Sequence, residues 1–286
     1  MQLISEIKDN NIFHIFACDI ILYYDSKYKT VYINLEGINI KNSCQKWRLF
    51  VMKKLYTNVK YLTDASSTKY INENTLTKTF DGYDCWKFIK YNPSPHLCKI
   101  YHKIISNKTL PQEKYILLNQ RNIDDRYLYD YNTKLKLEDF LFSKNLKYPL
   151  KVCNFSNMTP EKQYNICRNS SLFISAHGAG CTNLIFTPTE TPLIEINLRK
   201  HWYCDLLCDD HFHGKISINK KCNGTLNYRP YFHKADYHNL CYLINKKYIE
   251  MEAVEYGEGF GNRNPISKKN IYIDGNLLIK YINDLL

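Results

Sequence analysis

A tight turn between apolar runs is the feature that most restricts how this chain folds. Residues 172–196, LFISAHGAGCTNLIFTPTETPLIEI, contain an apolar run, a turn with two glycines, a second apolar run, a proline-rich loop and a third apolar run. Short apolar runs bounded by glycine and proline are typical of buried strands and short helices. The segment predicts a strand at SLFISA (171–176), a short helix at GCTNLIF (180–186) and a strand at PLIEIN (192–197).

The segments upstream continue this alternation. KYILLNQ (114–120) and YPLKVCNF (148–155) read as buried strands, and KLEDFLFSKN (136–145) reads as a helix between them. Thr159 followed by Pro160 is a helix start, because threonine caps the first turn and proline fits the first helical position. Strands that alternate with helices predict an α/β fold with a parallel sheet covered on both faces. Ligands of such sheets bind at the carboxyl ends of the strands.

Composition bounds the class of protein. A chain of 286 residues with 44% hydrophobic and 23% charged residues is typical of globular proteins. It contains no run of about 18 apolar residues, and its start, MQLISEIKDNN, has neither the basic nor the apolar region of a secretory signal. We therefore expect a cytoplasmic protein, and we expect its 11 scattered cysteines to be reduced thiols.

The net charge of +11 predicts an anionic partner. Charge alone leaves three kinds of partner open: nucleic acid, a membrane surface or a small molecule that carries phosphate. Solvated lysines without any partner also account for it, since this lysine-, asparagine-, isoleucine- and tyrosine-rich composition is what an AT-biased genome encodes.

The glycine turn itself is a candidate anion site. His177, Gly178, Ala179 and Gly180 follow a predicted strand and precede a predicted helix. Free backbone N–H groups and the helix dipole favour an anion there, and glycine allows phosphate oxygens to approach the backbone closely. A strand-to-helix turn that binds nothing is the alternative.

A pair of arginines follows another predicted strand directly. Arg121 and Arg126 lie in LLNQRNIDDRYLYD, which places them at the same edge of the sheet as the glycine turn. Guanidinium groups bind phosphate with paired hydrogen bonds and neutralise a leaving pyrophosphate. The alternative is a pair of surface arginines held by Asp124 and Asp125.

The N-terminal segment NNIFHIFACDIILYY predicts an amphipathic helix with a carboxylate in its apolar stripe. The stripe consists of Ile12, Ile15, Phe16, Ile20 and Tyr23. Asp19 falls near its middle, where an unpaired charge is costly, so this residue is a candidate base at the edge of a cleft. A salt bridge to a lysine is the alternative. His14 projects from a different side, as a second candidate base or as a cap of the helix start.

These three segments together resemble glycosyltransferase family 61, and the final segment NIYIDGNLLIKYINDLL resembles the strand and helix that close its domain. Among the branches of the family, the chain is most similar to the protein O-mannose N-acetylglucosaminyltransferase and EGF-domain O-GlcNAc transferase lineages. It departs from many members at Asp130, where they carry asparagine, and at Cys181, where they carry a small aliphatic residue.

The resemblance implies a GT-B architecture, with two Rossmann-like halves facing a cleft and mostly parallel sheets. Residues 1–110 would form the acceptor-side half, residues 111–270 the half that binds a nucleotide sugar, and residues 271–286 a closing helix that packs back toward the N-terminal half. It also implies inverting transfer from a UDP-sugar to a hydroxyl of a glycan or protein acceptor, without a metal or other cofactor. UDP-GlcNAc and UDP-xylose are the donors that we expect first.

The resemblance also implies roles for individual residues. Asp19 or His14 would be the general base. The donor site would contain Arg121, Arg126, His177, Gly178, Ala179, Gly180, Thr182 and Asn183. Glu195, near the end of the next strand, would accept the ribose hydroxyls, as acidic residues do in related nucleotide folds; a structural salt bridge is the alternative for this residue.

Three other functions have weaker support. An α/β-hydrolase needs a G-x-S-x-G motif, which the chain lacks. A nucleic-acid-binding protein would explain the positive charge, but the lysines are spread along the chain and no binding motif is present. A degenerate glycosyltransferase that binds sugar without transferring it stays open.

A zinc site at Cys204, Cys208, His211 and His213 has irregular spacing that fits no common finger.

Overall fold

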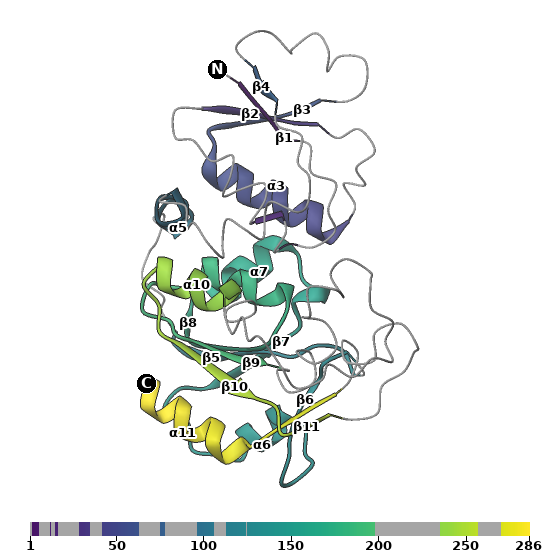
Figure 1. The fold of residues 1–286 in the computed structure, drawn as a ribbon, viewed down its shortest axis with the longest axis vertical. Coiled ribbons are helices and arrows are strands. Elements are labelled where there is room, and N and C mark those ends of the chain that lie inside the picture. The colour runs from purple at the N-terminus through teal and green to yellow at the C-terminus, as the bar shows by residue number, and fades with distance from the viewer. Residues whose placement is uncertain are drawn as a thin grey trace, which may run out of the picture.

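The computed structural model in Figure 1 describes residues 2–5, 12, 15–16, 29–34, 42–62, 75–77, 96–105, 113–123, 125–197, 235–256 and 270–286. These parts form a mixed α/β protein with mostly parallel sheets, which confirms the predicted fold class at this level. His14, Asp19 and the cysteines and histidines considered for zinc lie outside the described residues.

A four-stranded parallel sheet forms the end of the molecule that carries the N-terminus (Figure 1). In the order β3-β2-β1-β4, its strands are β1 (Gln2–Ser5), β2 (Thr30–Asn34), β3 (Asn58–Leu62) and β4 (Thr75–Thr77). Helix α3 (Ser43–Leu55) begins after Asn42, whose side-chain oxygen accepts a hydrogen bond from the Cys44 N–H at 2.8 Å, as expected of an N-cap. Helix α5 (His96–Ile105) packs against α3.

A five-stranded parallel sheet forms the second half, in the order β10-β9-β8-β5-β7. Its strands are β5 (Tyr115–Asn119), β7 (Leu150–Cys153), β8 (Ser170–Ala176), β9 (Leu193–Asn197) and β10 (Tyr248–Glu252). The first four are the strands predicted from the sequence. Each was recognisable because its apolar run ends at a polar or turn residue.

Short helices connect these strands, and the structure confirms those predicted. They are α6 (Leu137–Phe142), the 3-10 turn η4 (Phe155–Asn157), α7 (Pro160–Cys167), the 3-10 helix η5 (Ala179–Phe186) and α10 (Ala235–Leu243). The Thr159 side chain caps α7 by accepting a hydrogen bond from the Lys162 N–H at 3.4 Å, and Pro160 occupies the first helical position.

The two faces of this sheet carry separate apolar clusters, because successive side chains of a strand point to opposite faces. The face under α7, η5 and α10, which we call the α7 face, buries Tyr115, Leu117, Phe173 and Leu193. The opposite face, which we call the α11 face, buries Ile116, Leu118, Leu172, Ile174, Ile194 and Ile196 against α6 and α11. Figure 1 shows α7 and α10 on one side of the sheet and α6 and α11 on the other.

Helix α11 (Gly275–Leu285) closes the chain, but it does not pack toward the N-terminal half. Leu278 and Ile282 are buried on the α11 face, and α11 contacts α6 at the end of the molecule opposite the N-terminal sheet (Figure 1). The predicted packing direction is therefore wrong. The amphipathic pattern identifies a buried stripe on this helix, but it does not say which surface covers the stripe.

A small sheet holds the start of α11 in place. Its strands, in the order β11-β12-β6, are β6 (Leu128–Asp130), β11 (Glu255–Tyr256) and β12 (Ile271–Ile273), and the β11–β12 pair is antiparallel. Asp130 is fully buried and accepts hydrogen bonds from the Gly275 N–H at 2.9 Å, the Thr133 N–H at 2.7 Å and the Thr133 hydroxyl at 2.6 Å. Asp130 is thus a structural anchor for the start of α11.

The two halves share one apolar cluster. Val31, Trp47 and Ile100 belong to the same cluster as Phe173 and Phe186 of the second half. Ile15 and Phe16, two residues of the predicted N-terminal stripe, are also buried there, and the Phe16 and Trp47 rings lie 6.3 Å apart. A GT-B cleft between the halves, with the predicted boundaries, stays a prediction.

Candidate functional site

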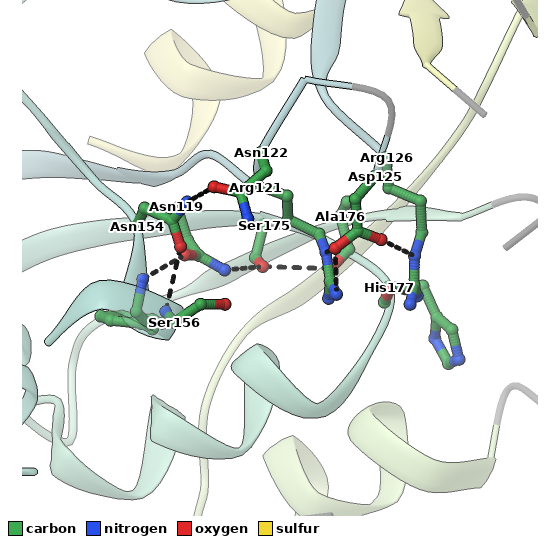
Figure 2. A network of polar contacts seen from close by, with 11 residues as sticks. Asn119, Arg121, Asn122, Asp125, Arg126, Asn154, Ser156, Ser175, Ala176 and His177 are labelled. Carbon is green, nitrogen blue, oxygen red and sulfur yellow. Dashed lines mark hydrogen bonds and ion pairs between the residues drawn. The ribbon is translucent and has the colours of Figure 1, made fainter. Parts of the chain in front are cut away.

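Polar side chains line the carboxyl edge of the five-stranded sheet on its α7 face. Along β5, β8 and β9 this face is apolar at first and then presents Asn119, Ser175 and Glu195, all of them buried. The Asn119 Nδ2 donates a hydrogen bond to the Ser175 Oγ at 2.9 Å (Figure 2). The change from apolar to polar therefore occurs at the strand ends, where open α/β sheets bind ligands.

The glycine turn lies at this edge, between β8 and η5. The His177 N–H donates to the Ile196 carbonyl at 2.8 Å and fixes the start of the turn to β9. Gly178 has a φ of +144°, a conformation that side chains rarely adopt. Residues 178–180 are partly exposed, whereas the rest of η5 is buried. The first N–H groups of this helix have no partner within it and are therefore available to an anion.

Both predicted arginines converge on this turn. A Cβ atom at Gly178 would lie 2.8 Å from the Arg126 Nη1 and 3.3 Å from the Arg121 Nη1. The Arg126 Nη1 also donates to the His177 carbonyl at 2.5 Å. Figure 2 shows the two side chains descending from their loop toward the turn. The structure thus brings Arg121, Arg126 and the 177–180 turn together, as the shared sheet edge predicts.

Glycine is required at two positions of the turn for steric reasons. At Gly178 the two guanidinium groups fill the space of a side chain. At Gly180 a Cβ atom would lie 2.7 Å from the Asn119 Nδ2. Neither glycine can be replaced without moving a polar side chain of the site.

The arginines keep a surplus of positive charge. The Arg121 Nη2 and Nε contact the Asp125 Oδ2 at 2.8 and 3.2 Å, and the Arg126 Nε lies 3.9 Å from the Asp125 Oδ1. The alternative of a local ion pair is therefore partly correct, but one carboxylate faces two guanidinium groups. Burial, and then the charge of Arg121, lower the pKa of Arg126 to about 10. Arg126 stays protonated at neutral pH, and a bound anion would relieve this repulsion.

A clamp that sequence reasoning missed holds the arginine loop in shape. The Gln120 side chain accepts from the Leu128 N–H at 3.0 Å and donates to the Leu128 carbonyl at 3.1 Å, so it joins the two ends of the loop. Its Nε2 also donates to the Glu138 Oε2 at 2.6 Å, and the Tyr127 hydroxyl donates to the Glu138 Oε1. Within this closed loop, Arg126 adopts a φ of +60°. Strained backbone of this kind persists where the surrounding structure imposes it.

Thr182 and Asn183 lie beneath the turn. Both are fully buried, and the Asn183 Oδ1 accepts a hydrogen bond from the Trp47 Nε1 of α3 at 2.9 Å. The Thr182 Oγ1 and the Asn183 Nδ2 have no hydrogen-bond partner among the described residues. The structure therefore joins Asn183 to the N-terminal half and leaves Thr182 buried beside it in η5.

Glu195 forms a buried chain with His177. The carboxylate is 1% exposed, its Oε1 lies 2.5 Å from the His177 Nδ1, and its Oε2 accepts from the Tyr248 hydroxyl at 2.7 Å. From α10, the Tyr237 hydroxyl donates to the Gly178 carbonyl at 2.8 Å, and the Tyr237 ring packs edge-on against the His177 ring. Sequence reasoning missed both tyrosines, because they come from elements far along the chain.

The described residues contain no group of three or more histidines, cysteines, aspartates or glutamates that would hold a metal ion. In the same parts of the chain, no helix combines the length and the apolar character needed to cross a bilayer. Cys181, next to the site, is buried, and its pKa is raised by that burial and then by the charge of Glu195. It is therefore an unreactive thiol at neutral pH.

Comparison with known proteins relates the part of the chain that contains this site to a known family. Residues 85–194 match the model of the family Glycosyltransferase 61. The matched segment includes Arg121, Arg126 and the 177–180 turn, and it ends one residue before Glu195. A comparison with curated proteins finds no match. The similarity to the O-GlcNAc transferase lineages stays a prediction.

Proposed function

Because residues 85–194 match the model of glycosyltransferase family 61, we propose that the protein is an inverting glycosyltransferase that uses a UDP-sugar donor. It transfers the sugar to a hydroxyl group of a glycan or protein acceptor, and UDP-GlcNAc and UDP-xylose are the first donors to test. The observation that carries the proposal is the convergence of Arg121 and Arg126 on the glycine turn at Gly178.

The chemistry of transfer explains why such a site is needed. The acceptor oxygen bonds to the anomeric carbon while the bond from that carbon to the diphosphate breaks, and the diphosphate leaves with the electron pair. Negative charge develops on the leaving group and is stabilised by cations and N–H donors already in place. Arg121, Arg126 and the N–H groups of residues 179 and 180 supply them, so we propose that no metal or other cofactor takes part.

A general base must remove the proton of the acceptor hydroxyl. Asp19 and His14 remain the proposed bases. The buried positions of Ile15 and Phe16, within the shared apolar cluster, support a place for this segment beside the second half. The parallel sheet in each half supports the proposed GT-B arrangement.

Incubation of the purified protein with a panel of UDP-sugars and hydroxyl acceptors tests the proposal. We expect mass spectrometry to detect UDP release together with an acceptor that gains the mass of one sugar. In a parallel thermal shift assay we expect stabilisation by UDP, its loss in Arg121→Ala, and its retention in Arg168→Ala. Arg168 is the matched control because it follows the last residue of α7, just before β8 begins, and therefore lies at the opposite edge of the sheet from the site.

Two outcomes would contradict the proposal. Stabilisation by single-stranded RNA but not by UDP would favour a nucleic-acid-binding protein. Binding of UDP without transfer from any donor would favour a catalytically inactive binding protein.

A further inference from the structure

We propose that Glu195 is a positioning residue that acts on the diphosphate site through His177, with Tyr248 holding it in place, and that it does not bind the ribose. This inference rests on the proposed function, because it assigns a role within the same donor site. It replaces the ribose-binding role that a glutamate at the end of a strand suggests.

The burial of Glu195 separates it from any ligand at the sheet edge. Its side chain is 1% exposed, and both of its oxygens already have protein partners, the His177 Nδ1 at 2.5 Å and the Tyr248 hydroxyl at 2.7 Å. A ribose binds through hydroxyl groups that must reach the carboxylate directly. Because the carboxylate is buried, no ribose can do so without opening the packed face around it.

The partners of Glu195 are suited to holding a charge in place. Burial and then the charge of Glu195 raise the pKa of Tyr248 far above its usual value, so this phenol keeps its proton and donates to the carboxylate. The His177 ring in turn presents Nδ1 to the carboxylate, which fixes the orientation of the ring. Hydrogen bonds to an ionised carboxylate are the stronger ones in proteins.

His177 connects the Glu195 carboxylate to the groups that we propose bind phosphate. Its carbonyl accepts from the Arg126 Nη1 at 2.5 Å, and its N–H donates to the Ile196 carbonyl at 2.8 Å. The next residue, Gly178, is the one over which both guanidinium groups lie. A change in the His177 ring therefore moves the carbonyl that orients Arg126 and the first N–H groups of η5.

Inorganic pyrophosphate separates this role from ribose binding, because it carries the diphosphate without the ribose. We expect Glu195→Gln, which keeps an acceptor oxygen but loses the charge, to weaken the binding of UDP and of pyrophosphate by the same factor, about tenfold. Tyr248→Phe should weaken both by a smaller factor. Glu113→Gln is the matched control, since it makes the same substitution at an exposed glutamate just before β5, at the opposite edge of the sheet, and it should leave both affinities unchanged. Isothermal titration calorimetry measures all of these affinities.

A double-mutant cycle tests whether Glu195 acts through His177. In a His177→Ala background, Glu195→Gln should cause no further loss of pyrophosphate affinity. A general structural role would instead lower affinity in both backgrounds, together with the melting temperature.

The inference is overturned if Glu195→Gln weakens UDP binding but leaves pyrophosphate binding intact, or if its effect persists without His177. A wild-type protein that binds pyrophosphate but does not prefer UDP would contradict the proposed function. The pyrophosphate cycle would still decide the role of Glu195 in that case.

Discussion

Asp130 and Glu195 are both buried carboxylates beside the five-stranded sheet, but they lie on opposite sides of it and have different partners. On the side of α11, Asp130 is bonded by the Gly275 and Thr133 N–H groups and by the Thr133 hydroxyl, none of which titrates near neutral pH. On the α7 face, Glu195 is bonded by the phenol of Tyr248 and by the imidazole of His177, the residue that begins the glycine turn. The first carboxylate anchors a helix, and the second is joined to a candidate site.

The comparison shows that burial alone does not indicate a function. What separates the two sides is where the polar groups lie along the strands. The α11 face is apolar up to the strand ends, whereas the α7 face becomes polar at Asn119, Ser175 and Glu195. If this distinction is correct, substitutions near the α7-face edge should weaken ligand binding, and substitutions elsewhere should change stability alone.

Gly178→Ala should have the largest effect on binding. Its Cβ would lie 2.8 Å from the Arg126 Nη1, and the backbone φ of +144° disfavours alanine, so both arginines and the turn must move. We expect the affinity for UDP, measured by calorimetry, to fall by about a hundredfold or more, which corresponds to about 2.7 kcal/mol.

Gly275→Ala is the matched control for this substitution. Its Cβ would lie 2.5 Å from the Phe140 Cε1 and 2.6 Å from the Asp130 Oδ1, so it should lower the melting temperature. The folded fraction should still bind UDP with wild-type affinity. A loss of affinity in Gly275→Ala equal to that in Gly178→Ala would remove the distinction between the two sides.

Arg126→Ala should have the next largest effect. It removes a charged donor from the turn, and hydrogen bonds to charged groups contribute about 1.5–3 kcal/mol each, so we expect a tenfold to hundredfold loss of UDP affinity by calorimetry. Arg126→Lys should restore only part of the affinity, because lysine keeps the charge but not the planar fork. Full affinity in Arg126→Ala would show that the diphosphate binds elsewhere.

Asp130→Asn should lower stability at neutral pH by about 2 kcal/mol and leave UDP affinity unchanged. Burial raises the pKa of Asp130, but its hydrogen bonds from Thr133 and Gly275 outweigh burial, so the folded pKa lies below the usual value of 3.8. The ionised group therefore stabilises the fold fully at pH values above the unfolded pKa, and this contribution is lost as the pH falls through the lower folded pKa.

Urea unfolding of the wild type and Asp130→Asn between pH 7 and pH 3 measures this effect. The difference in unfolding free energy should be constant near neutrality and should shrink below the unfolded pKa of about 3.8. A difference that grows on acidification would contradict the depressed pKa.

Tyr115→Phe should have the smallest effect. Tyr115 lies on the α7 face but at the amino end of β5, where its hydroxyl donates to the Ile166 carbonyl at 2.5 Å. Loss of one such bond should lower the unfolding free energy by about 1 kcal/mol in urea denaturation, without a change in UDP affinity. A clear loss of affinity would mean that the whole α7 face, and not its edge, determines binding.

Local sequence signals predict much of the second half. The apolar runs of β5, β7, β8 and β9 and the Thr159–Pro160 start of α7 are visible without the structure, because period and capping are properties of neighbouring residues. The convergence of Arg121 and Arg126 on the glycine turn is also predictable, since the carboxyl ends of parallel strands share one edge.

Interactions between distant segments were not predictable in the same way. Tyr248 follows Glu195 by more than fifty residues, so no local pattern shows that its hydroxyl donates to the Glu195 carboxylate. The Gln120 clamp depends on how the loop to Leu128 closes. The direction of α11 depends on which surface receives its apolar stripe, and the wrong prediction for this helix has that cause.

A crystal structure of the protein with UDP tests the central claim most directly. The account predicts that the diphosphate oxygens lie within hydrogen-bonding distance of the Arg121 and Arg126 guanidinium groups and of the backbone N–H groups of residues 179 and 180, with Glu195 still bonded to His177 and Tyr248. A diphosphate bound elsewhere, with both arginines left on Asp125 and the turn unoccupied, would contradict it.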